Sequence, residues 1–433
     1  MCDQPFGCPI LNSIDEGKQP QKIKFLDLVT NRDFAFLLYG GISASVTMTL
    51  RTLVSFQWLY QETGSAATLG LLGVVQFLHM PLAVYGGILA DRVDRKKLMA
   101  FTQLTSFILL IALTGLAWKE MLEPWHIFVI TGVAGIFNML GSAAKPAMLP
   151  RVVPRHLLSH AVTSQTACTQ MSGILAPLLF WQLYDYFGVT TAFAVAAIIA
   201  MTSTVSPLLI RASGQPDESK IKNTFNSLKE GYLFVINHRL LPGLYSLDIA
   251  VTVVSFYRQL FPVFAFQLYG LGASGTGLLN TANSVGAVAG TLLVLYTSRF
   301  NRKGLLVLIA TLGYAFLILA FGFNKIFVVG LIIVGMLGAM DAVGMTMRQA
   351  VVQLTTPDRL LGRASSAHSF AAMGANNIGQ VHVGVMAGLI GAGATMVLGG
   401  VISIVGVVFI WKFIPGIQRY RYDPDKPFEE IPD

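Results

Sequence analysis

The sequence predicts an all-α integral membrane protein with twelve transmembrane helices in two pseudo-symmetric six-helix bundles, and three observations carry this prediction. Of the 433 residues, 54% are apolar and only 12% are charged, whereas soluble domains carry about 25% charged residues. The charged residues leave long uncharged stretches, and roughly 20 apolar residues suffice to cross a bilayer. The basic residues alternate between the ends of these stretches, and the second half of the chain repeats the first.

The uncharged stretches give the helices in order. The first begins after a polar tail, which is not the layout of a cleaved signal peptide. Two stretches are long enough for two spans each, and they divide at 270–275 and 391–393, where glycines favour tight turns. The expected helices lie near 34–60, 66–90, 98–118, 124–145, 157–184, 189–210, 240–268, 273–298, 304–323, 326–348, 363–390 and 394–413.

The positions of lysine and arginine test this helix count. With the N-terminus inside, seven inner segments, among them 145–156 and 348–363, hold 26 of the 30 basic residues. The outer loops hold only Lys119 and Lys325, and the remaining two, Arg51 and Arg258, fall inside spans. Cytoplasmic loops are rich in Lys and Arg, so both termini are expected in the cytoplasm and the net charge of +8 requires no nucleic acid. The expected parts are a tail (1–33), a first bundle (34–210), a linker (211–239), a second bundle (240–413) and a C-terminal tail (414–433).

Apolar residues in the linker recur at spacings of three and four. They are Ile221, Phe225, Leu228, Tyr232 and Val235. This spacing predicts an amphipathic helix on the inner membrane surface, which we expect to tether the two bundles rather than to bind a partner.

The two halves match at polar and basic positions. A shift of 207 residues relates the early helices, and a shift of 203 relates the helices from the fourth on. Six-helix repeats with a substrate site between them recur among secondary transporters. The matched pairs include Arg51 with Arg258, Arg92 with Arg299, Arg95 with Arg302, Lys96 with Lys303, Asn138 with Asp341 and Lys145 with Arg348.

The loop between the second and third helices carries a motif. Its positions are Gly87, Asp91, Arg92, Arg95 and Lys96, and with them the chain resembles the major facilitator superfamily. The stretches 145–154 and 353–363 look like loops of its enterobactin-exporter-like (transmembrane secretion effector) branch. This resemblance implies the major facilitator fold, transport by alternating access, and a bacterial cytoplasmic (inner) membrane location.

The loop motif is expected to act as a conformational gate. Asp91, at a helix end, can pair with cations or with helix N-terminal N–H groups across the seam between the halves. The alternative is that the loop only anchors the topology by charge, and this is the reading that we favour for Arg95 and Lys96.

Charged residues inside spans are costly, at roughly 2.5–3.5 kcal/mol each at mid-span, and therefore mark functional candidates. Here they are Arg51, Asp248, Arg258 and Asp341. The resemblance implies that the first, fourth, seventh and tenth helices line the central cavity, and the fourth contributes Asn138. We therefore expect these five residues at the substrate site.

Arg51 and Arg258 occupy the same position in the two repeats. A pseudo-two-fold axis would set them opposite each other, where two guanidiniums attract planar anions such as carboxylates or phosphates. The alternative is that each pairs with a neighbouring acid or extends towards the headgroups. The hypothesis is therefore an anionic substrate.

Asp248 and Asp341 are candidate proton carriers, because burial raises a carboxyl pKa and a nearby arginine lowers it. Asp248 can equally be a structural partner for an arginine. Proton coupling is an expectation from the resemblance.

The leading functional prediction is a monomeric secondary transporter that exports a small anionic or amphiphilic, siderophore- or drug-like compound in exchange for protons. The alternatives are lysolipid translocation, uptake by the same fold and, less favoured, a membrane-embedded enzyme. The spans contain no catalytic motif such as His-Glu-x-x-His, and the three cysteines support neither a metal site nor a disulfide framework. No cofactor is expected, and the expected partners are a small-molecule substrate and the lipid bilayer.

Overall fold

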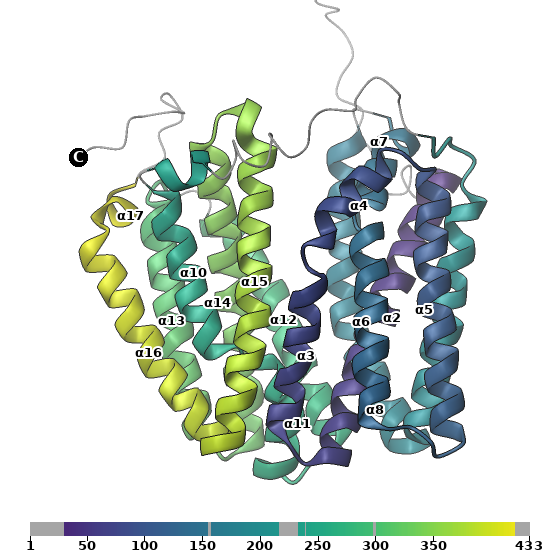
Figure 1. Ribbon diagram of the computed structural model, residues 1–433. Coiled ribbons are helices and arrows are strands. Elements are labelled where there is room, and N and C mark those ends of the chain that lie inside the picture. Colours follow the sequence, from purple (N-terminus) through teal and green to yellow (C-terminus); the bar gives the residue numbers. More distant parts are fainter. Residues whose placement is uncertain (1–29, 155–156, 216–232, 239, 298–299, 421–433) are drawn as a thin grey trace, which may run out of the picture.

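The computed structural model describes residues 30–154, 157–215, 233–238, 240–297 and 300–420. Every regular element in these ranges is a helix. Figure 1 shows two bundles side by side, one running from purple to blue-green and the other from green to yellow. The predicted linker helix falls mainly on 216–232, outside the described residues.

The first bundle contains six spans, and two of them are broken. The second span is divided at Met80 and Pro81, since proline lacks the backbone N–H that would continue the helix. The fourth is divided at Ser142 and Ala143. Its elements are α2 (Arg32–Thr63), α3 (Ala66–His79), α4 (Leu82–Ala90), α5 (Arg95–Trp118), α6 (Pro124–Gly141), α7 (Ala144–Val152), α8 (Leu158–Val205) and η2 (Ser206–Leu209).

The second bundle also contains six spans. Its first span, expected as one helix over 240–268, is interrupted at Phe256 and continues as short helical turns. Its elements are α10 (Leu241–Ser255), η4 (Arg258–Leu260), α11 (Phe261–Val263), η5 (Phe264–Leu268), α12 (Ala273–Thr297), α13 (Lys303–Phe323), α14 (Phe327–Thr355), α15 (Asp358–Ile390), α16 (Ala392–Phe413) and α17 (Pro415–Arg419).

The lengths and surfaces of the helices fit a bilayer. Nine described helical stretches are long and apolar enough to cross a membrane, and one of them, Leu158–Leu209, holds two of the predicted spans. The divided span of α3 and α4 and the more polar α15 complete the twelve. Large apolar side chains such as Leu78, Ile198 and Val405 lie exposed on the outside, where lipid would cover them.

The turns differ at the two ends of the bundles. At one end, here called the linker end, lie the loop at Asp91 and the short helix α17 (Figure 1). At the opposite end, here called the far end, five of the six turns contain a residue with positive φ. Gly188 joins the two spans of α8 with φ 79° and ψ 176°, a conformation that is essentially restricted to glycine. The far-end turns are therefore tight.

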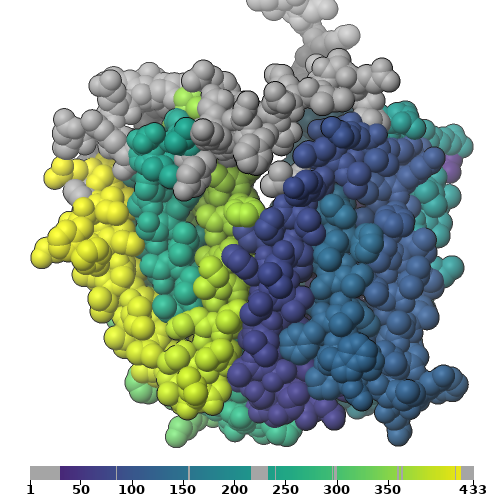
Figure 2. Space-filling model, in the orientation of Figure 1, coloured from purple at the N-terminus to yellow at the C-terminus, as the bar shows by residue number. Residues whose placement is uncertain are grey.

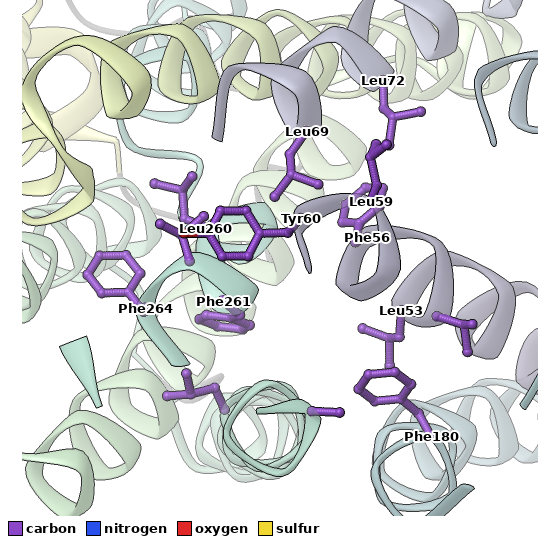
Figure 3. Packing of buried hydrophobic residues seen from close by; sticks show 14 of the residues in the cluster. Leu53, Phe56, Leu59, Tyr60, Leu69, Leu72, Phe180, Leu260, Phe261 and Phe264 are labelled. Carbon is purple, nitrogen blue, oxygen red and sulfur yellow. The ribbon is translucent and has the colours of Figure 1, made fainter. Parts of the chain in front are cut away.

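The apolar core shows where the bundles meet. At the far end a single cluster of buried residues includes side chains from both bundles. Figure 3 shows Tyr60 and Leu69 of the first bundle beside Leu260 and Phe261 of the second. At the linker end the core splits into two separate clusters, one in each bundle. The bundles are therefore sealed together at the far end, whereas their cores are separate at the linker end. Figure 2 shows the two bundles in contact along the visible seam.

Small residues allow the close approach at the seam. Helix α3 packs on α15, and α8 packs on α12. Where α3 crosses α15, a Cβ added at Gly384 would lie 2.5 Å from the Cα of Gly70. Lipid supplies no hydrophobic drive between helices, so contact of this kind must come from backbone proximity.

Candidate functional site

A cavity of about 400 Å³, here called the central cavity, lies between the two bundles. The first bundle contributes α2, α3 and α6 to its walls. The second bundle contributes α12, α15 and the irregular segment that follows α10. Along α15 its lining residues precede the far-end core residue Val383. The cavity therefore lies on the linker-end side of the far-end seal.

Arg51 projects from the middle of the continuous helix α2 and lines the central cavity. The residue is only 9% exposed. Within the described part of the chain no ion pair or hydrogen bond occupies its guanidinium. A charge that is buried without a partner is costly, so this group is available to a ligand.

Arg258 reaches the same cavity from the break in the seventh span. Phe256 leaves the helical conformation there, with φ −70° and ψ 85°. The hydroxyl of Tyr314 donates to the freed carbonyl oxygen of Ser255 at 3.3 Å, and Asn283 donates to the hydroxyl of Tyr257. Irregular backbone at membrane depth is tolerated where protein satisfies it or a cavity borders it, and broken helices of this kind occur at transporter binding sites.

The two arginines thus line one cavity, although their surroundings differ. Arg51 is buried in a regular helix, whereas Arg258 is exposed in a 3₁₀ turn. Among the described residues, no Asp or Glu lines the central cavity. Two cationic groups therefore face a common space without a protein carboxylate between them.

The rest of the cavity wall combines polar side chains with methionines and phenylalanines. Asn138 of α6 is part of it, as expected, and its amide contacts the sulfur of Met48 at 3.7 Å. Several further polar residues line the cavity, and nothing in their spacing along the sequence indicated that they face it. These residues are Gln76, His79, Asn280, Asn377 and Gln380.

The structure does not place Asp248 in the central cavity. Its carboxylate pairs with Arg348 of α14 at 2.7 Å, and the two side chains are 11% and 8% exposed, respectively. This pair and Asp341 line a separate cavity of about 30 Å³ within the second bundle. The expected cluster of five residues is therefore divided, with Arg51, Arg258 and Asn138 in the central cavity and the two acids outside it.

The position of Arg348 corrects the sequence analysis. Counting cations by side placed it in the inner segment 348–363, but it lies inside α14 and is 7% exposed. The repeat pairs Arg348 with Lys145. Lys145 likewise lines a cavity inside its bundle, so the two repeats place a cation at the same depth. A charge count cannot show the depth of a residue at the end of a span.

The ion pair and the side-chain hydrogen bonds of the loop motif lie within the first bundle. Asp91 forms an ion pair with Arg95 at 3.7 Å and keeps 64% of its side chain exposed. Arg95 also donates to the carbonyl oxygens of Ala90 and Ala147 at 3.1 and 3.2 Å, and Lys96 donates to that of Ile210 at 3.1 Å. Gly87 has open space where a Cβ would stand, and Arg92 is exposed.

Polar contacts between described residues also join the bundles at the far end. The backbone N–H of Ser274, in the first turn of α12, donates to the carboxylate of Asp185 at 2.9 Å. The hydroxyl of Thr276 donates to the side-chain carbonyl oxygen of Gln57 at 2.7 Å in a buried position. Together with the shared core they close the far end.

Comparison with known proteins adds the family. The model of the transmembrane secretion effector family matches residues 29–431. The enterobactin exporter EntS of Citrobacter koseri is 26% identical over 399 residues, which cover 92% of this chain and 93% of the relative. The EntS protein of Escherichia coli O1:K1 / APEC is 26% identical over 397 residues and is covered to 92%.

Solved structures agree on the fold. The nucleoside transporter NupG superposes with a TM-score of 0.70 at 12% identity, covering 90% of this chain and 99% of that one. A bacterial homologue of the human lysosomal transporter Spinster superposes with a TM-score of 0.68 at 14% identity, covering 91% and 99%. These similarities identify the major facilitator fold predicted from the sequence.

Proposed function

This chain belongs to the transmembrane secretion effector family of major facilitator transporters, and from that premise we propose that it exports a small anionic or amphiphilic compound by alternating access, in exchange for protons. As a member of this family it is a multi-pass integral membrane transporter with a small-molecule substrate rather than an enzyme. We further propose that it works as a monomer in a bacterial cytoplasmic membrane, with both termini in the cytoplasm.

The observation that carries the proposal is the pair of guanidiniums in the central cavity. Arg51 and Arg258 line it together, and no carboxylate lines it with them. A guanidinium binds a carboxylate or phosphate with two parallel hydrogen bonds. A substrate with such a group would supply the negative charge that the cavity lacks.

The arrangement of the bundles fits one state of an alternating-access cycle. The far end is sealed by the shared core and by the contacts of Asp185 and Gln57. At the linker end the cores are separate. Under the proposed topology this is the inward-open state, in which a cytoplasmic compound enters the central cavity.

Asp91 is the proposed gate of the other state. Here it pairs with Arg95 of its own loop, and among the described residues no ion pair or hydrogen bond joins it to the second bundle. Closure of the linker end would bring the second bundle towards this carboxylate. The contact between Asp91 and the second bundle would then form and break once in each cycle. Gly87 and Arg92 belong to the same proposed gate.

The proposed proton carriers are the acids of the second bundle. Asp248 and Asp341 share one small cavity with Arg348. Protonation of either acid would change the charge around this arginine and hence the ion pair that links α10 to α14. This would couple protons to the conformation without contact between the acids and the substrate.

The similarity to enterobactin exporters favours export and a siderophore- or drug-like substrate over uptake. The divided core favours a polar cavity between the bundles over the laterally open apolar path that lysolipid movement requires.

The test is uptake into inverted membrane vesicles, whose outer surface is the cytoplasmic face, with a panel of acids and their neutral analogues. We expect an imposed pH gradient to drive transport of one or more acids. Arg51→Ala and Arg258→Ala should each raise the KM at least tenfold, because a hydrogen bond to a charged group contributes about 1.5–3 kcal/mol. The matched control is Lys325→Ala, which removes an exposed cation outside the cavity. Unchanged affinity for an acid in both arginine variants would refute an anionic substrate, and indifference to the pH gradient would refute proton coupling.

A further inference from the structure

The first bundle contains a second cavity of about 350 Å³, here called the lateral cavity. It adjoins the central cavity, because Ser45, Met48, Arg51 and Asn138 line both. Its other walls come from α5, the start of α7 and both spans of α8. A compound in the central cavity could therefore extend into it beside Arg51.

The lateral cavity is lined by two cations and no acid. Lys145 joins Arg51 there, and none of the lining residues is Asp, Glu or His. Among the described residues, neither cation has an ion pair or hydrogen bond. The hydroxyl of Thr47, a residue that is 3% exposed, lies in the same wall and is also buried without a partner. Such groups gain most from a ligand that accepts hydrogen bonds.

The second bundle shows what is missing. The shift of 207 residues pairs Gly41 with Asp248, and the shift of 203 pairs Lys145 with Arg348. The counterpart cavity of about 30 Å³ is built from equivalent positions, and in it Asp248 neutralises Arg348 at 2.7 Å. The equivalent positions in the two cavities are Ala44 and Val251, Ser45 and Thr252, Asn138 and Asp341, and Gly141 and Gly344.

In the first bundle the position of Asp248 is taken by Gly41, which has no carboxylate. A Cβ at Gly41 would lie 2.1 Å from the ammonium nitrogen of Lys145, so this ammonium lies where the acid of the other repeat begins. The first bundle therefore has the cation of the pair but not its acid. The larger volume of this cavity is the space in which an external acid would fit.

We propose that the lateral cavity is an anion subsite in which Lys145 and Arg51 bind the carboxylate of the transported compound, in the role that Asp248 plays for Arg348. This inference rests on the proposed function for the identity of its ligand. The ammonium of Lys145 and the guanidinium of Arg51 donate to the carboxylate oxygens, and the hydroxyl of Thr47 supplies a third donor. Ligand binding would neutralise a charge on the first bundle that the second bundle neutralises within the protein.

The experiment measures benzoate binding to the purified full-length protein in nanodiscs by calorimetry, with neutral benzamide as the matched probe. The key variant is Gly41→Asp, which restores the acid of the other repeat and can displace the flexible end of Lys145. Gly41→Asn has nearly the same shape without the charge. We expect benzoate to bind the wild type and benzamide not to. Gly41→Asp should weaken benzoate binding about tenfold to a hundredfold, and Gly41→Asn should weaken it much less.

A second variant protects the test against misfolding. Lys145→Met should weaken benzoate binding by a similar factor, whereas Lys145→Arg should retain it. Equal losses in Gly41→Asp and Gly41→Asn would show that space rather than charge is responsible, and would overturn the proposal. Chloride or inorganic phosphate binding as well as benzoate at equal ionic strength would also overturn it, because the subsite would then take solution anions.

The outcome separates this subsite from the proposed function. Benzoate binding that is equal in the wild type and Gly41→Asp refutes the subsite, while export of acids that depends on Arg258 still stands. Benzoate binding that is lost in Gly41→Asp supports the subsite, even if no acid of the panel is exported.

Discussion

The buried ion pair between Asp248 and Arg348 predicts an unequal response to the loss of either partner. Two unit charges 2.7 Å apart attract by roughly 6 kcal/mol at an effective dielectric constant of about 20. Desolvation of both groups offsets much of this attraction, and removal of one partner of a buried pair costs about 3–5 kcal/mol. The two side chains are 8% and 11% exposed, so solvent screens the interaction little.

The neighbouring acid makes the two deletions different. Arg348→Met leaves Asp248 and Asp341 in one small cavity without their cation, so its cost should reach about 5 kcal/mol. Asp248→Asn keeps Arg348 near the charge of Asp341, and its cost should stay near 1–3 kcal/mol, that of a lost charged hydrogen bond. The double variant should be less destabilised than the sum of the two.

The assay is unfolding of the purified protein in mixed micelles, followed by tryptophan fluorescence, with Lys325→Met as an exposed-charge control. A larger loss in Asp248→Asn than in Arg348→Met, or strict additivity of the two, would refute this reasoning.

Three further predictions concern the ends of the bundles. Asp185→Ala removes the acceptor for the N–H of Ser274 and should weaken the far-end seal by about 0.5–2 kcal/mol. A cysteine at position 280 in an otherwise cysteine-free chain should then react faster with an impermeant maleimide added from the far side. An unchanged rate contradicts the role of this contact. Gly391→Ala should cost about 1–3 kcal/mol of unfolding free energy, because the φ of Gly391 is 86°; Gly406→Ala, where a Cβ would meet open space, should be neutral by comparison, and equal effects argue against backbone strain. The neutral imidazole of His238 accepts the N–H groups of Leu240 and Leu241 at 3.1 and 3.3 Å, and burial lowers the pKa of His238. Stability should therefore fall as pH drops below the ordinary pKa of about 6.5, and His238→Asn should abolish that dependence in a melting-temperature series from about pH 7.5 to about pH 5.5.

Much of the architecture could be predicted from the sequence because the bilayer constrains each transmembrane span separately. Each crossing needs an apolar stretch of its own, and the inner loops need Lys and Arg. Arg51 and Arg258 were identified as a pair for the same reason, since a charge inside a span is rare and its repetition at a fixed shift is rarer.

The tertiary structure decided what depends on contacts between distant segments. It separated Asp248 and Asp341 from the central cavity, placed Arg348 inside α14, and broke the seventh span where Tyr314 satisfies the freed backbone. It also determined which end of the bundles is sealed, through Gln57, Asp185 and the shared core. Composition and spacing report the preference of each helix for lipid over water, which is a local free energy. The face that each helix turns to its neighbours is settled only when all twelve pack together, so the cavities and their charges belong to the assembled bundles.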